Sequence, residues 1–317
     1  MVSIGLRRKT GDERRGASQW AVAWRRFKKH KSGLLGLAML IALVIIAIFN
    51  VYLAPYPARG DPGALRPLYE GEAGQPPSWK HWFGTSLIGT DVYSDVVHAS
   101  VYTVYVAFLG TIITMLICIS VGLVAGYYGR GIDNVLMRIT EVFLVFPSLL
   151  LILVFARLFT LSNADPFVDI LGLKIPIGLT LVIFIVSVFQ WSSYARVIRG
   201  EVMALRQSEY IQASKSLGAS SVTLMIKHIL PNILPQVIVL STLTMAGIVL
   251  VEAAVSFLGF GDPNTATWGQ LMQSGWEYTS TIWWAEVFPG LAVFFTVLAF
   301  NLMGDGLADA MNPRLRE

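Results

Sequence analysis

Residues 34–53 read LLGLAMLIALVIIAIFNVYL, a run of twenty residues without a charged side chain. A transmembrane helix needs about 20 mainly apolar residues to cross a hydrocarbon core about 30 Å thick. The run is therefore long enough to span a membrane once. It follows a long basic segment, and no clear small-x-small cleavage site comes after it. We therefore interpret it as a retained helix and not as a signal peptide.

Five more stretches of the sequence have the same character, and together they decide the fold class. They centre on residues 101–125, 135–156, 174–196, 232–257 and 286–305. The composition agrees, because 55% of the 317 residues are hydrophobic and only 14% are charged, against about 25% charged in soluble domains. We predict an all-α integral membrane protein with six transmembrane helices. The same values exclude a disordered chain and a nucleic-acid-binding tail protein.

The distribution of Lys and Arg predicts the orientation in the membrane. If the N-terminus is cytoplasmic, the inside segments are 1–31, 126–138, 194–228 and 305–317, and they hold 19 of the 24 Lys and Arg residues. Positive residues concentrate in cytoplasmic loops. We therefore expect a multi-pass protein of the cell (inner, cytoplasmic) membrane with both termini in the cytoplasm.

Four segments follow from this topology. Residues 1–31 form a basic cytoplasmic segment, in which Trp20, Trp24 and Phe27 recur at helical spacing and predict a surface amphipathic helix over 18–31; residues 1–16 are expected to be disordered. The first transmembrane helix occupies 32–58. Residues 59–97 form an extracytoplasmic loop rich in Pro and Gly, expected to be irregular with little core. Residues 98–317 form a core domain with the other five transmembrane helices.

The sequence lacks the motifs of the common enzyme classes. It contains no GxxxxGK[ST], HExxH or GxSxG pattern. The single cysteine, Cys118, allows no intramolecular disulfide and no CxxC metal site. A membrane protease or esterase is the enzymatic alternative, but no histidine shares the depth of Glu252, the one acid deep in an apolar run. We therefore expect no catalytic residue, metal or cofactor in this chain, and any nucleotide hydrolysis in another polypeptide.

Residues 194–235, YARVIRGEVMALRQSEYIQASKSLGASSVTLMIKHILPNILP, are too long for a simple connection between two spans. Tyr210, Ala213 and Leu217 lie on one face of a predicted helix. Gly218 can adopt the left-handed conformation that ends a helix, and Ser220 or Ser221 can then cap a second helix over 222–229. The pattern predicts two short helices that meet at a glycine and project into the cytoplasm, a rigid protrusion suited to contact with a soluble partner.

This stretch resembles the EAA loop of permease subunits in bacterial and archaeal ABC importers. The family pattern is E-A-A, three residues, G, nine residues, and I-x-L-P. Here Gln212, Ala213 and Ser214 stand at the E-A-A positions, Gly218 at the glycine, and HILP at 228–231 ends the motif. Gln, Ser and His replace the family's Glu, Ala and Ile, so the acid of the motif is missing while the hinged shape is kept.

Further motifs resemble one branch of these permeases. HWFGTSLIGTDVYSDV at 81–96 resembles H-x-x-G-T-D-x-x-G-R-D-V-x-S, with Ser86 and Thr90 in place of Asp and Arg. Residues 125–151, 251–261 and 288–315 resemble other segments of the same branch, so the resemblance covers roughly 18–316. The chain is thereby similar to the C-type permease subunit of the dipeptide/oligopeptide/nickel ABC importer family.

The resemblance implies a type I ABC importer permease fold and a membrane-spanning subunit of an ATP-driven, binding-protein-dependent importer, most simply for di- or oligopeptides. It implies four partners: a second homologous permease, two ABC ATPase subunits that use ATP and Mg²⁺, an extracytoplasmic solute-binding protein, and membrane lipid. Nucleic acid is not expected. The implied ATPase-coupling residues lie in and after the EAA loop helix: Glu209, Tyr210, Ile211, Gln212, Ala213, Ser214, Lys215, Leu217, Gly218 and Pro231. Tyr210, Ile211 and Leu217 are expected to fill a groove on the ATPase.

Glu252 is the strongest single candidate for a functional residue within the membrane-spanning part. A carboxylate at the bilayer centre costs about 3 kcal/mol on insertion scales, so it should face either the translocation path or a neighbouring helix that bonds it; both readings stay open. Two other functions also stay open. One is the same role for nickel or oligosaccharides, and the other is a stand-alone channel or secondary transporter, which leaves the protrusion unexplained.

Overall fold

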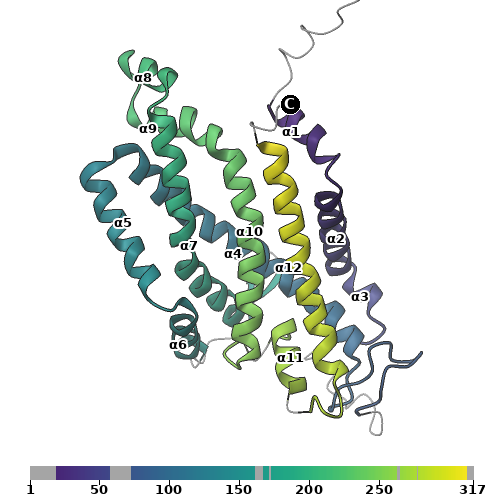
Figure 1. Cartoon of the computed structure of the whole chain (residues 1–317). Coiled ribbons are helices and arrows are strands. Elements are labelled where there is room, and N and C mark those ends of the chain that lie inside the picture. Colours follow the sequence, from purple (N-terminus) through teal and green to yellow (C-terminus); the bar gives the residue numbers. More distant parts are fainter. Residues whose placement is uncertain are drawn as a thin grey trace, which may run out of the picture.

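Long apolar helices dominate the structure, a computed structural model that describes residues 19–57, 73–160, 167–170, 173–262, 265–276 and 278–312 (Figure 1). The expectations for residues 1–18 and 58–72 lie outside these ranges. The helices are α1 (Gln19–Phe27), α2 (Lys31–Ile48), α3 (Asn50–Leu53), α4 (Val92–Tyr128), α5 (Arg130–Val145), α6 (Ser148–Thr160), α7 (Ile177–Arg206), α8 (Glu209–Ser216), α9 (Ser221–Thr223), the π-helical turn η2 (Leu224–Ile229), α10 (Leu230–Phe257), α11 (Trp268–Trp276) and α12 (Trp284–Met311).

The predicted helical membrane fold is confirmed. Within the described ranges, five helices are long and apolar enough to cross a membrane: α2, α4, α7, the continuous run Ser221–Phe257, and α12. A sixth span results if α5 and the first part of α6 are counted together. The described part adds one short antiparallel hairpin, β1 (Phe167–Ile170) with β2 (Leu173–Pro176), which precedes α7.

The third predicted span is not one straight helix. α5 ends at Val145, α6 begins at Ser148, and the two axes differ by 82°. The break falls at Phe146 and Pro147. Proline removes a backbone donor and disfavours helical geometry in the residue before it, which explains why the apolar run 135–156 bends here.

The fifth span, in contrast, is longer than predicted. The helix that begins after Gly218 does not stop at Pro231 but continues through η2 into α10, with Pro235 inside the helix. The wider π-helical turn lies directly before the two prolines, as expected where the regular hydrogen-bond ladder is interrupted. The second short helix of the predicted protrusion is therefore the first turn of a span.

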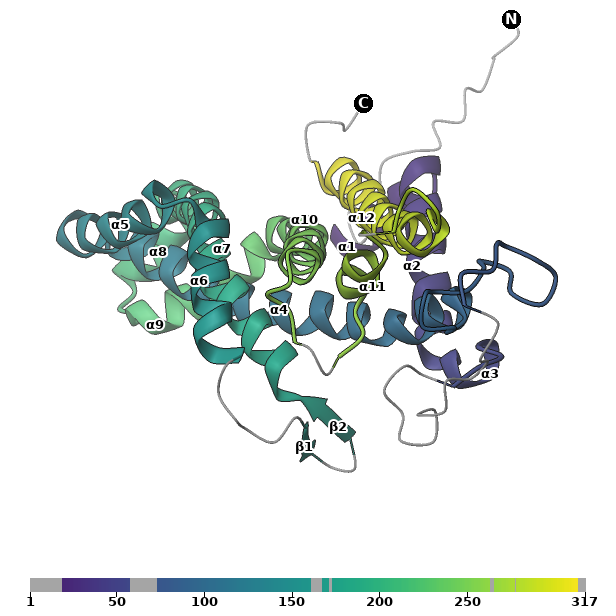
Figure 2. The same ribbon diagram turned by 90° about the horizontal axis from the view of Figure 1, so that it is seen from below.

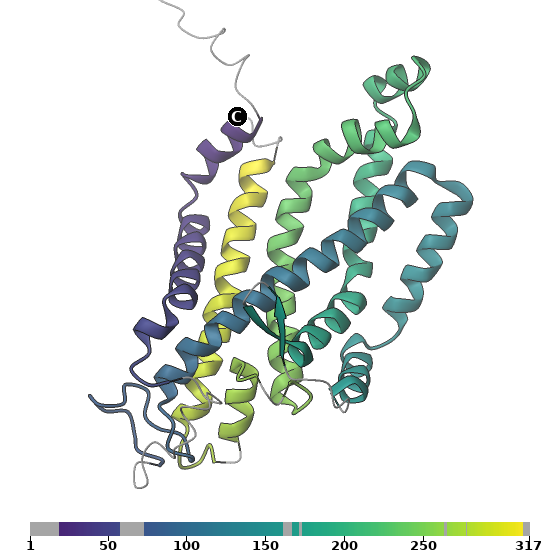
Figure 3. The same cartoon turned by 180° about the vertical axis from the view of Figure 1, so that it is seen from behind.

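α4 contacts most of the other long helices of the bundle. It runs diagonally across α12, α10 and α7, as Figures 2 and 3 show. Its most extensive contact is with α7. Gly122 and Gly126 face α7 there: a Cβ atom on Gly122 would lie 2.8 Å from the Ala195 carbonyl oxygen, and one on Gly126 2.7 Å from Val202 Cβ. Small residues let membrane helices approach this closely.

Both described ends of the chain lie at the same end of the bundle. Arg26 Nη1 in α1 donates to the Asn312 carbonyl (3.2 Å), and the His30 ring Nε2 lies 3.0 Å from Asp309 Oδ2 in α12. α8 projects at this same end (Figure 1). A helix is present as α1 over Gln19–Phe27, shorter than the predicted 18–31, and Phe27 is buried against the protein and not free for the membrane surface. The placement of the ends agrees with an even number of crossings.

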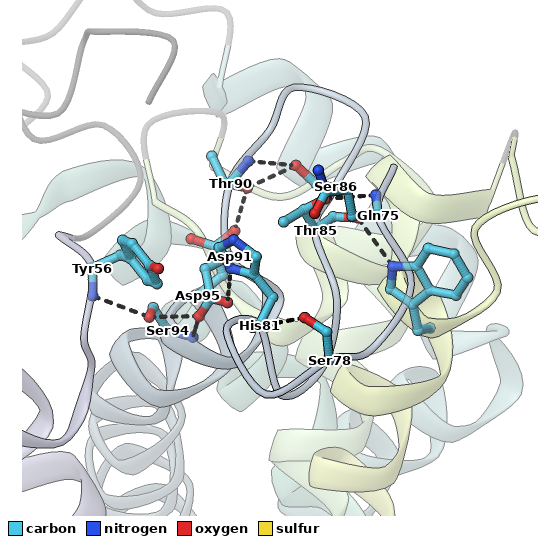
Figure 4. Close-up of polar contacts among 11 residues, drawn as sticks. Tyr56, Gln75, Ser78, His81, Thr85, Ser86, Thr90, Asp91, Ser94 and Asp95 are labelled. Atoms are coloured by element: carbon cyan, nitrogen blue, oxygen red, sulfur yellow. Dashed lines mark hydrogen bonds and ion pairs between the residues drawn. The ribbon is translucent and has the colours of Figure 1, made fainter. Parts of the chain in front are cut away.

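The loop 73–91 at the opposite end is irregular, as predicted, but it has a buried polar core (Figure 4). His81 is fully buried, and its Nδ1 lies 2.8 Å from Asp91 Oδ1. Asp91 also caps α4, because its Oδ2 accepts hydrogen bonds from the backbone N–H (2.8 Å) and hydroxyl (2.7 Å) of Ser94. The expectation of little core therefore fails for this part of the loop.

Ser86 and Thr90, the two residues that differ from the outer-loop motif, are hydrogen-bonded to each other. The hydroxyls of Ser86 and Thr90 lie 2.8 Å apart, and Thr90 Oγ1 donates to Asp95 Oδ2 at 2.7 Å (Figure 4). A chain of hydroxyl hydrogen bonds thus occupies the positions where the motif has an acid and a base. Trp284 Nε1 donates to the Thr85 carbonyl (3.0 Å), which fixes the loop to the start of α12.

Candidate functional site

The protrusion at the end of the bundle has the hinged form that the sequence predicts. α8 ends at Ser216, and Gly218 adopts φ +88°, in the left-handed region that favours glycine. Ser220 then caps the next helix, since its hydroxyl accepts a hydrogen bond from the Thr223 backbone N–H at 3.2 Å. The geometry of both residues is confirmed.

Ile211 holds α8 against the bundle. It is only 1% exposed and belongs to the buried cluster that includes Val202, Leu224 and Ile229. Gln212, at the position of the motif's acid, donates through Nε2 to the Arg206 carbonyl at 2.8 Å and so fastens α8 to the end of α7. The prediction that Ile211 fills a groove on a partner needs correction, because its side chain is already packed inside this chain.

The remaining coupling residues leave an exposed surface. Tyr210 is 44% exposed and Leu217 is 89% exposed, and both stand clear of the buried cluster. Exposed aliphatic side chains on the following turns, Val222 and Ile226, extend this apolar surface beyond the predicted set. Glu209, Gln212, Ala213, Lys215, Gly218 and Pro231 are exposed, and Ser214 is half-buried. We call Tyr210, Leu217, Val222 and Ile226 the knob surface.

An ion pair joins α7 to the start of α5. The Arg199 guanidinium donates to both carboxylate oxygens of Asp133, through Nε to Oδ1 and through Nη2 to Oδ2 at 2.6 Å. The Asp133 side chain is 9% exposed and that of Arg199 29%. A two-bond contact of this kind fixes orientation as well as distance. Arg199 thus holds α5 on α7, two turns before α7 leads into α8.

A cavity of about 320 Å³ lies between the α5–α6 bend, α7 and α10. All twelve lining residues are uncharged. Five of them carry a polar side-chain group: Ser148, Gln190, Ser192, Ser193 and Tyr194. Gly247 opens the α10 wall, where a Cβ atom would lie 3.4 Å from Gln190 Oε1 and 4.0 Å from the Tyr194 hydroxyl. The cavity thus has neutral hydrogen-bonding groups beside aromatic and aliphatic walls.

Glu252 lies outside this cavity. It is 4% exposed, and its Oε1 accepts a hydrogen bond from the Ser256 hydroxyl one turn later in α10 at 2.7 Å. This contact lies within α10 itself, so it does not decide between a bond to a neighbouring helix and a place on the translocation path. A role in the translocation path stays an untested prediction.

The cavity residues are not among the predicted site residues. The stretch QWSSY at 190–194 does contain a polar cluster inside an apolar span, and that is a usable signal because polar side chains in transmembrane helices are costly unless they face a partner or a path. Gly247 gives no such signal, because its role depends on the packing of α10 beside α7. Among the described residues, no group of three His, Cys, Asp or Glu side chains could hold a metal ion.

Comparison with known proteins places the chain among transport permeases. Residues 118–317 match the family described as "Binding-protein-dependent transport system inner membrane component", and residues 18–77 match the "N-terminal TM domain of oligopeptide transport permease C". These two segments together cover most of the sequence.

Curated relatives match over nearly the full length. The chain is 34% identical to the dipeptide transport system permease protein DppC of Bacillus subtilis, covering 93% of this chain and 85% of the relative. It is 31% identical to the oligopeptide transport system permease protein OppC of the same organism (96% and 92%), and 33% identical to the glutathione transport system permease protein GsiD of Pectobacterium atrosepticum (94% and 92%). The chain therefore belongs to the family of binding-protein-dependent transport system inner membrane components, as a multi-pass membrane permease subunit.

Proposed function

We propose that this permease subunit forms one half of the membrane path of an ATP-driven peptide importer. Relatives named for transport of dipeptides, oligopeptides and glutathione match over more than nine-tenths of the chain. A second permease completes the path, two ATPase subunits supply the power, and a binding protein delivers the peptide from outside.

One observation supports the coupling role above all others: α8 stands out from the bundle on a glycine hinge, fixed by the buried Ile211, while the knob surface remains exposed. In this proposal the knob surface docks into the ATPase. The end of the bundle with α1, α8 and the last turn of α12 then faces the cytoplasm, in agreement with the excess of Lys and Arg in the segments at that end.

The test is the substitution Leu217→Asp. An apolar anchor at the centre of an interface typically contributes about 2 kcal/mol, so its replacement by a charge should weaken ATPase binding roughly thirtyfold or more. We expect the ATPase to be lost when the complex is purified in detergent, while the variant still inserts and pairs with the second permease.

Ile88→Asp is the matched control. Ile88 is also an exposed aliphatic residue, 57% exposed, but lies in the loop at the opposite end of the bundle. It should leave ATPase co-purification unchanged. Equal ATPase recovery with Leu217→Asp and with the control would contradict docking through the knob surface.

A further inference from the structure

We propose that the cavity between α5–α6, α7 and α10 is a binding subsite for the backbone amides of a peptide in transit, with Gln190 as its main hydrogen-bonding group. The inference rests on the proposed function and adds the place and the chemistry of substrate contact. The volume of about 320 Å³ lies at the lower end of the range found for small-molecule sites, about 300–1,000 Å³.

The state of Gln190 is the first observation. Its side-chain nitrogen Nε2 is buried and, within the described ranges, has no hydrogen-bond partner. Buried polar groups are nearly always paired, because an unpaired donor loses its hydration without compensation. The amide atom beside Gly247 is the acceptor Oε1, and a turn of the amide plane would bring the unpaired donor to a ligand acceptor such as a peptide carbonyl.

The absence of a side chain at position 247 is the second observation. Gly247 faces both Gln190 Oε1 and the Tyr194 hydroxyl, and a methyl group there would meet them at ordinary contact distances of 3.4 and 4.0 Å. Alanine would fit, but a bulky side chain such as leucine would cover the amide and the phenol. Glycine thus keeps both polar groups accessible from the cavity.

The lining as a whole indicates the class of ligand. Amide and hydroxyl groups can donate and accept hydrogen bonds, and they are interleaved with aromatic walls from Phe143, Phe146 and Phe189. Backbone amides occur in every peptide, so contacts to them need no particular side-chain sequence. A lipid acyl chain cannot form hydrogen bonds with the five polar lining residues. It is the alternative occupant that the test must exclude.

Site-directed alkylation tests the subsite in the assembled importer. Gly247→Cys is made in a Cys118→Ala background and reconstituted with the second permease, the ATPases and the binding protein. The probe is a tripeptide whose central side chain carries a bromoacetyl group, and mass spectrometry detects the modified chain. Leu243→Cys is the control, since Leu243 lies one turn away on α10 and its Cδ2 is directed at Gly304 of α12.

We expect Gly247→Cys to be alkylated only during ATP turnover, with excess unmodified tripeptide preventing the reaction and Leu243→Cys remaining unmodified. Normal tripeptide import without alkylation at position 247 would overturn the subsite. Alkylation that needs no ATP and is insensitive to competing peptide would also overturn it, because it would show a slot open to lipid or to the other permease.

A second variant keeps the inference testable if the cysteine disturbs folding. Gln190→Leu preserves the shape and removes the hydrogen-bonding groups, so tripeptide import should fall about tenfold, as for the loss of one to two hydrogen bonds. Gln190→Asn should restore part of it, and ATPase assembly should not change. Unaltered import by Gln190→Leu would contradict the subsite. If the parent complex itself imports no peptide, the proposed function fails, and the subsite fails with it.

Discussion

Gly122→Leu should prevent the chain from folding stably in the membrane. A Cβ atom at this position would lie 2.8 Å from the Ala195 carbonyl oxygen and 2.8 Å from Ile198 Cγ2. Neither neighbour can move aside without separating α4 from α7, the most extensive helix contact in the bundle. Overpacking of a close contact costs about 1–3 kcal/mol and more where backbone is involved. We expect a loss of about 3 kcal/mol or more and little monodisperse protein in detergent.

Gly200→Leu is the matched control for this experiment. Gly200 also lies inside a long helix, α7, but nothing comes within 4 Å of a Cβ atom placed on it. The two substitutions change helix propensity equally and differ only in packing. Thermal unfolding, monitored by size-exclusion chromatography, measures the difference in stability between the two variants. Equal melting temperatures would refute the close crossing of α4 and α7.

Asp133→Ala should have the next largest effect. It leaves the Arg199 guanidinium without its two-bond partner in a place where both groups are mostly removed from solvent. Removal of one member of a fully buried pair costs about 3–5 kcal/mol. Because Arg199 retains some solvent contact, we expect about 2 kcal/mol, measured as the free energy of unfolding in mixed detergent micelles.

A second experiment measures the interaction energy between Arg199 and Asp133 directly. In a double-mutant cycle with Asp133→Ala and Arg199→Ala, the coupling energy should be about 2 kcal/mol. The same cycle on Arg138 and Glu141, whose side chains are 83% and 45% exposed, should give no more than about 0.5 kcal/mol. Equal coupling energies for the two pairs would show that the contact between Arg199 and Asp133 is only a surface ion pair.

The location of this ion pair suggests how movement at α8 reaches the cavity. Arg199 lies on α7 shortly before α8, and Asp133 lies at the start of α5, whose far end lines the cavity at Phe143 and Leu144. A displacement of α8 by the ATPase would therefore be passed to α5 through a rigid contact. On this account, Asp133→Ala also reduces ATP-driven import more than it reduces ATP hydrolysis.

Local chemistry and long-range packing differ in how well the sequence predicts them. The hinge at Gly218 and the cap at Ser220 were predicted because both depend on residues a few positions apart. Most of the spans were predicted because a run of about 20 apolar residues is recognisable from local hydropathy. Both features are properties of short stretches of chain.

Features that depend on neighbouring helices were not predicted. Nothing within α8 shows that Ile211 points inward, because its contacts come from α7 and η2. The cavity brings together Gln190 of α7 and Gly247 of α10, two residues on different helices. The break at Pro147 has a local signal, but the size of the bend depends on what α5 and α6 pack against. The proline at 235 carries the same signal and stays inside a helix.

ATP-driven peptide import is tested by accumulation of a labelled tripeptide in proteoliposomes that contain this chain, the second permease and the binding protein, with and without the ATPase pair. We expect uptake against a gradient only when the ATPases and ATP are present on the side of α8, and we expect Leu217→Asp to abolish it. Accumulation against a gradient without the ATPases would contradict ATP-driven import.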